Sequence, residues 1–156
     1  MKLTINREYA MRHLFVALLM LGLGCWFGYD GFVRYPAMPA AELYRTIEGA
    51  DAPETCDLEA FKRQKTKSQH GFAILALLAA LVVGTNLFRS WRFRFAFDDE
   101  GYVYKGARRR YGDIKKVDWS QWEKKGIVKV DGVALDSWHH VGVKEFVGKI
   151  GEGKCG

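Results

Sequence analysis

The sequence has little cysteine or histidine, and neither residue is spaced as a binding site requires. Its three cysteines, Cys25, Cys56 and Cys155, are isolated and form no CxxC pair, which argues against a disulfide framework and a zinc site. The sequence also lacks a P-loop, a nucleophile elbow, an HExxH motif and any internal repeat. We therefore predict no catalytic residue, no metal and no cofactor, and expect a protein that is not an enzyme.

Charged residues are nearly absent from two stretches of the chain. Between residues 13 and 33 the only formally charged residue is Asp30, and residues 71–88 carry no charge. A helix of about 21 residues rises about 30 Å, which is the thickness of the hydrocarbon layer of a bilayer. Both stretches are apolar on every side, which lipid favours and water does not. The sequence therefore predicts transmembrane helices at 13–33 and 70–89, after an N-terminal cytoplasmic segment 1–12.

A cleaved signal peptide is the alternative for the first stretch. Lys2, Arg7 and Arg12 precede an apolar core, as in such a peptide, but no small-x-small cleavage site follows. Lysine and arginine near the helix ends set the expected orientation: seven stand outside the two helices and six between them. This excess favours an integral membrane protein with both termini in the cytoplasm.

The connecting segment 34–69 predicts two short helices. The first covers 39–48, with a proline at an early position and Gly49 available to end it. Thr55 or Asp57 is expected to cap the second helix, which continues into the second apolar stretch because no residue between them forbids a helix. The segment is too short for a core of its own, so it should pack against something else.

Residues 91–150 predict a small, mainly β domain that carries most of the basic excess within the formal net charge of +6. Phe93, Phe95 and Phe97 alternate with other residues, which is the period of a half-buried strand. Further strands are expected at 102–105, 108–111, 114–119, 127–130 and 133–135. The pair Asp131-Gly132 is the strongest hairpin signal, because both positions of such a turn need positive φ. The predicted strand order is a β-meander.

A helix is expected to close this meander. Val143, Phe146, Val147 and Ile150 recur at helical spacing and form one apolar stripe, and residues 151–156 are expected to fray. The predicted fold class is therefore membrane α plus β, with two transmembrane helices followed by a small antiparallel β-meander domain closed by a C-terminal helix.

Several features of residues 91–150 occur together in one known kind of domain. They are the Asp-Glu-Gly turn, the stretch Arg110-Tyr-Gly-Asp-Ile114 leading into Trp119, the Asp131-Gly132 hairpin, Leu135-Asp-Ser-Trp138 and the closing helix. In these features the segment resembles the bacterial PH-like domains that lie beside paired transmembrane helices in small membrane proteins of uncharacterised function. The resemblance implies a bent antiparallel sheet closed by the helix, and a binding or scaffolding role. Five or six strands are predicted here where a full PH-like sandwich has seven, and no phosphoinositide pocket is inferred.

The densest set of basic residues lies in the β domain and is the candidate binding site. This basic set comprises Arg108, Arg109, Arg110, Lys115, Lys116, Lys124 and Lys125. The short tether from Phe88 keeps the domain near the bilayer, so contact with anionic lipid headgroups is expected. A solvated basic face is the alternative, and the tether makes nucleic-acid binding less natural.

The predicted function is protein-protein or membrane-surface binding, as a homo-oligomer or as a subunit of a larger assembly. The alternative is a component of a membrane transport or enzyme complex that uses Asp30 or the His139/His140 pair. Neighbouring residues on a strand face opposite ways, which argues against a metal held by that pair. Asp30 lies within one turn of the end of its apolar stretch, where its carboxylate is expected to reach interfacial water.

Overall fold

The chain folds into two compact units that do not follow its linear order. The computed structural model describes residues 1–152, so Cys155 and residues 153–156 of the predicted tail lie outside the described residues. One unit consists of Met1–His13 together with the chain from Thr85 onward, and the other is Leu14–Gly84. The β domain predicted at 91–150 therefore also includes residues from the start of the sequence.

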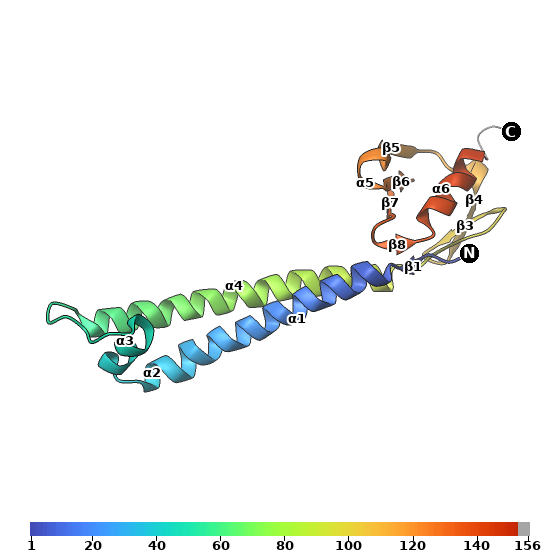
Figure 1. Ribbon diagram of the computed structural model, residues 1–156. Helices are drawn as coiled ribbons and strands as arrows, with labels where there is room; N and C mark the ends of the chain where they lie inside the picture. The colour runs from blue at the N-terminus through green and yellow to red at the C-terminus, as the bar shows by residue number, and fades with distance from the viewer. Residues whose placement is uncertain (153–156) are drawn as a thin grey trace. The chain divides into compact units, whose positions relative to one another are not determined.

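The two apolar stretches form long helices (Figure 1). The first segment runs through α1 (Arg7–Tyr29), the π-helical turn η1 (Asp30–Arg34) and α2 (Tyr35–Ala37), and the second is α4 (Leu58–Arg92). Both are long and apolar enough to cross a membrane, and only 6% and 11% of their most apolar windows are buried. Each helix extends beyond its predicted span, 13–33 or 70–89, because the polar residues at the ends continue the helical ladder.

Contacts within the unit 14–84 pair the two helices antiparallel. The backbone of Gly24 lies close to Leu77, since a Cβ added at that glycine would stand 2.7 Å from the leucine side chain. Nearer to the connecting segment, the ring centroids of Phe27 and Phe72 lie 5.5 Å apart. The remaining faces of the pair expose large apolar side chains, which is the surface that lipid accommodates.

The connecting segment forms the two expected helices. Helix α3 (Ala40–Glu48) ends at Gly49, whose φ of 73° is accessible to glycine at little cost. Asp57 caps α4 by accepting a hydrogen bond from the backbone N–H of Ala60 at 2.9 Å. Leu43 is fully buried and Lys62 donates to the carbonyl oxygens of residues 36 and 38. These hydrogen bonds join residues of the segment 34–69 to one another, so the packing of this segment against something else stays a prediction.

The β domain contains two three-stranded antiparallel sheets in place of the single predicted meander. One sheet comprises β2 (Phe95–Phe97), β3 (Gly101–Tyr104) and β4 (Ala107–Arg110), and the other comprises β5 (Val117–Gln121), β6 (Ile127–Val130) and β7 (Val133–Asp136). A 3-10 turn, η2 (Tyr111–Asp113), separates them, and α5 (Trp122–Lys125) joins β5 to β6. The meander order holds within each sheet.

Two of the hairpins have turn residues with positive φ values. Asp131 and Gly132 have φ of 47° and 83°, so the predicted turn between β6 and β7 is confirmed. Lys105 and Gly106 have φ of 50° and 82° and form an equivalent turn between β3 and β4. The sequence did not predict this turn, because the lysine before Gly106 is not a typical residue for it.

Residues 1–5 add a strand that the sequence did not predict. Leu3 N–H donates to the carbonyl oxygen of Phe95 at 2.9 Å, and Lys2 forms a bridge with Ala96. On the same segment, β1 (Thr4–Ile5) pairs antiparallel with β8 (His140–Val141). The segment therefore hydrogen-bonds to both ends of the β domain.

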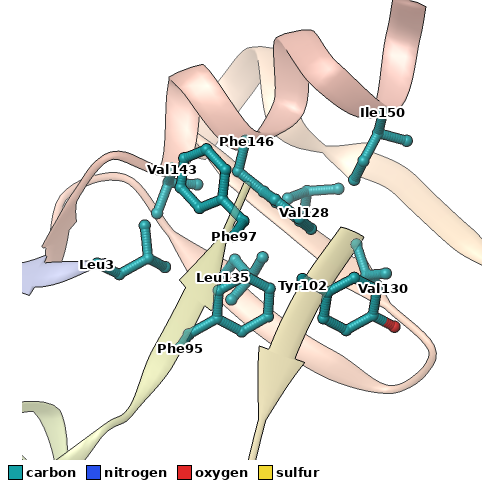
Figure 2. Close-up of a cluster of buried hydrophobic side chains, with 10 residues drawn as sticks. All are labelled: Leu3, Phe95, Phe97, Tyr102, Val128, Val130, Leu135, Val143, Phe146 and Ile150. Atoms are coloured by element: carbon teal, nitrogen blue, oxygen red, sulfur yellow. The ribbon is translucent and has the colours of Figure 1, made fainter. Parts of the chain in front are cut away.

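The core of the β domain lies between the two sheets and α6 (Val143–Glu152) (Figure 2). Figure 2 shows Phe146 of α6 pointing toward side chains of both sheets, and Leu3 reaching the same cluster from the N-terminal segment. The buried side chains are Leu3, Phe95, Phe97, Tyr102, Val128, Val130, Leu135, Val143, Phe146 and Ile150. The predicted apolar stripe of the closing helix is confirmed, and the helix continues to Glu152 across the first two residues of the predicted tail.

Candidate functional site

The predicted basic set lies on three separate elements of the β domain. Arg108, Arg109 and Arg110 are on the exposed edge strand β4, and Lys124 and Lys125 are in α5. Lys115 and Lys116 lie between η2 and β5 and are exposed. The order of the two sheets leaves β4 at an edge, which explains why three consecutive arginines reach solvent there.

Carboxylates of the same domain compensate two of these arginines. Arg108 lies 2.9 Å from an oxygen of Asp98 and 3.0 Å from an oxygen of Glu100, and Arg109 lies 3.5 Å from Asp131. The backbone N–H of Glu100 and the Arg108 guanidinium hold the pKa of Asp98 below its usual value. These pairs join neighbouring turns and strands, so Arg108 and Arg109 offer less charge to a ligand than their sequence suggests.

Asp131 connects the two sheets at this edge. Its carboxylate accepts hydrogen bonds from the backbone N–H groups of Lys115 and Lys116, at 3.1 and 3.0 Å. Burial opposes ionisation of Asp131, but these two hydrogen bonds, Tyr102 and Arg109 together lower its pKa. Lys115 and Lys116 therefore contribute their backbones to the structure, while their side chains stay exposed.

The structure separates His139 from His140. The ring of His139 lies tilted against that of Tyr9, with the centroids 4.3 Å apart, and its Nε2 lies 3.6 Å from Asp136. His140 is 6% exposed, and its Nε2 lies 3.0 Å from the carbonyl oxygen of Ser90 at the end of α4. Within residues 1–152, no group of three or more histidine, cysteine, aspartate or glutamate side chains is placed to hold a metal ion.

Acidification should destabilise the β domain through His140. Burial lowers the pKa of His140 below its usual value of about 6.5, outweighing the Ser90 carbonyl oxygen and Asp136, which raise it. The unfolded chain therefore binds a proton that the folded chain resists, so the free energy of unfolding falls as pH drops below about 6.5. We expect the melting temperature of the detergent-solubilised native chain to fall between pH 7 and pH 5, and to fall less in the His140→Gln variant. His139→Gln serves as the control and should retain the decrease; an unchanged decrease in His140→Gln would contradict this assignment.

Asp30 lies in a buried polar cluster within the unit 14–84. It is 6% exposed, accepts a hydrogen bond from Trp26 Nε1 at 3.1 Å, and lies 3.5 Å from the guanidinium of Arg34. The prediction that this carboxylate reaches interfacial water is therefore wrong. Two side chains one turn away, Trp26 and Arg34, surround it. Arg34 remains partly exposed and carries the solvent contact.

Sequence reasoning missed the partner of this cluster on α4. His70 Nε2 lies 3.0 Å from the carbonyl oxygen of Gly31, and its ring stacks on Phe32 at 4.1 Å. Gly31 belongs to η1, and a Cβ there would stand 2.6 Å from the histidine ring, so only glycine permits this approach. A signal was available in the sequence. The polar pair Gln69-His70 stands at the start of the second apolar stretch, and Asp30 stands near the end of the first, so an antiparallel pair of helices brings them to the same level.

The start of α1 and the end of α4 both contact the β domain. At the start of α1, Tyr9 is buried and the guanidinium of Arg12 lies over the ring of Trp138 at 5.7 Å. At the end of α4, Ser90 meets His140, and the backbone continues through Phe93 into β2. We call this region, residues 1–13 with 85–94, the helix-end junction.

The arrangement defines a small β domain attached to a pair of long apolar helices. Comparison of the chain with protein-family models, with curated proteins and with solved structures gave no match.

Proposed function

We propose that the chain is a non-enzymatic integral membrane protein whose β domain lies at the bilayer surface and binds membrane lipid or a protein partner there. The expected location is a bacterial inner membrane, with the β domain and both ends of the sequence in the cytoplasm. The proposal includes assembly of several copies, or of this chain with another protein, since two helices leave most of their apolar surface exposed.

The observation that carries this proposal is the helix-end junction. Strand β1 precedes α1 and strand β2 follows α4, and a hydrogen bond of 2.9 Å from Leu3 to Phe95 joins the two segments within one domain. Two spanning helices return a chain to the side from which it started, which is what these hydrogen bonds require. The exposed apolar faces of both helices supply the reason for burial in lipid.

The same junction favours a retained first helix over a cleaved signal peptide. Leu3 is 2% exposed in the core of the β domain, and β1 pairs with β8. Cleavage after the first apolar stretch would remove both Leu3 and β1, and would leave the edge of β8 without a paired strand.

We also infer that the β domain is PH-like. Residues 2 and 3 extend the sheet β2-β3-β4 by a short fourth segment, the sheet β5-β6-β7 supplies three more strands, and α6 closes the core. With this N-terminal segment, the two sheets together contain seven strand segments, which is the number in a full PH-like sandwich. In this proposal the fold supports a binding role, and the ligand is argued from side chains.

The alternative of a transport or enzyme component receives less support. The carboxylate of Asp30 is satisfied by Trp26 and Arg34 of its own helix, which is a local arrangement. His140 is buried against the end of α4, while His139 pairs with Asp136, so the two imidazoles do not face a common substrate.

Thiol labelling of single-cysteine variants tests the proposed placement. One variant keeps Cys56 in the connecting segment, and the other carries Ser120→Cys on the exposed end of β5, with the native cysteines replaced. We expect a membrane-impermeant maleimide to label Cys56 in intact cells, and the Ser120→Cys variant only after lysis. Labelling of both positions in intact cells, or of neither, would refute two spanning helices. Labelling of the Ser120→Cys variant alone would refute the cytoplasmic β domain.

A further inference from the structure

A hollow of about 540 Å³ opens in the helix-end junction. One wall is the N-terminal strand segment, residues 2–5, and the other is the end of α4 with the start of β2, residues 88 and 91–94. All of these residues belong to the same compact unit. The predicted basic set on β4 and α5 contributes no residue to the hollow.

The lining of this hollow is cationic and carries no carboxylate. Its charged residues are Lys2, Arg92 and Arg94, and all three are exposed. Among the described residues none of the three forms an ion pair with a carboxylate, in contrast to Arg108 and Arg109. Three cations without a carboxylate partner around one concave surface favour an anionic occupant, because negative charge relieves their mutual repulsion.

The aromatic residues of the hollow are of the kind that contacts lipid. Phe88 and Trp91 are 51% and 71% exposed, and they lie where the uncharged part of α4 ends. Such residues occupy the interface between hydrocarbon and headgroups. The guanidinium of Arg92 lies over the Phe88 ring at 5.4 Å, so the charge stays next to the apolar surface. An anionic headgroup with attached acyl chains satisfies both the cations and the exposed rings.

We propose that this hollow binds the phosphate headgroup of an anionic phospholipid, with Lys2, Arg92 and Arg94 contacting the phosphate and Phe88 and Trp91 contacting the upper acyl chains. This inference rests on the proposed membrane placement and names the ligand of the domain. It also assigns lipid recognition to the helix-end junction, whereas the sequence analysis expected it at the basic set.

Native mass spectrometry of the full chain in detergent tests the proposal, with phosphatidylglycerol as the probe and phosphatidylcholine as the neutral comparison. The test variant is the triple Lys2→Gln, Arg92→Gln, Arg94→Gln. The matched control loses the same charge from the predicted basic set, as Arg110→Gln, Lys124→Gln, Lys125→Gln. We expect phosphatidylglycerol to bind the test variant at least about tenfold more weakly than the native chain, and the control to bind like the native chain.

Three outcomes would overturn the proposal. Equal weakening in both triple variants would show a general charge effect, and unweakened binding in the test variant would exclude the hollow. Competition by soluble glycerol phosphate as effective as by the lipid would show a site for free phosphate esters. The assay uses purified protein, so it is independent of the labelling experiment: a failure of the lipid test leaves the membrane placement standing, and a failure of the labelling test leaves the binding result interpretable. Unchanged melting temperatures of the triple variants would show that the fold is intact.

Discussion

Replacing Leu3 by alanine is expected to lower the free energy of unfolding of the β domain by about 2–5 kcal/mol, the range for a buried leucine. Leu3 is 2% exposed and lies in the same core cluster as Phe95 and Val143. The substitution removes its contacts and leaves a cavity that two sheets and a helix surround. Denaturant unfolding in detergent, followed by tryptophan fluorescence, measures the change.

The neighbouring residue supplies the control for this substitution. Thr4 is exposed, so Thr4→Ala should change the free energy of unfolding by less than about 0.5 kcal/mol. A Leu3→Ala variant as stable as the Thr4→Ala variant would mean that the N-terminal segment is not part of the β domain. It would also remove the main support for placing both helix ends at one domain.

Phe146→Ala should have the largest effect of any single substitution in the closing helix, about 3–5 kcal/mol. The ring of Phe146 is fully buried and meets Phe95, Phe97 and Tyr102 edge-on, at centroid distances of 4.8, 5.4 and 5.7 Å. Edge-to-face pairs add stabilisation beyond the buried area, so one truncation weakens three aromatic contacts. The same fluorescence-detected unfolding measures the loss.

Lys144→Ala is the matched variant on the same helix. Lys144 is exposed on α6, and its replacement should be nearly neutral. If Phe146→Ala were no more destabilising than Lys144→Ala, the closing helix would not form the lid of this core. Phe146→Leu, which retains most of the apolar volume, should recover a large part of the lost stability.

Local signals in the sequence predicted the elements that neighbouring residues determine. The Asp131-Gly132 turn needs only two positions of positive φ, and the stripe of Val143, Phe146 and Ile150 needs only helical spacing. The cap of α4 at Asp57 follows the same rule. In each of these cases the residues concerned lie within a few positions of one another.

Features that depend on distant pairings were missed. The alternation of Lys2, Leu3, Thr4 and Ile5 has the period of a strand, but nothing near it in the sequence identifies Phe95 or Val141 as a partner. The compensation of Arg109 by Asp131 likewise depends on how the two sheets meet. The basic set could be identified by residue type, whereas the carboxylates that neutralise part of it could not.

The pairing of Leu3 with Phe95 also constrains the order of events during synthesis. The ribosome makes residues 1–5 before α4, but every strand with which they pair follows α4 in the sequence. Domains normally fold as units while the chain grows, and contacts between distant residues form slowly. Here β1 must wait until both helices have been made, so in the proposed membrane placement helix insertion precedes completion of the β domain. During that interval β1 has no partner strand, and a chaperone or a second chain can reach its unpaired backbone groups.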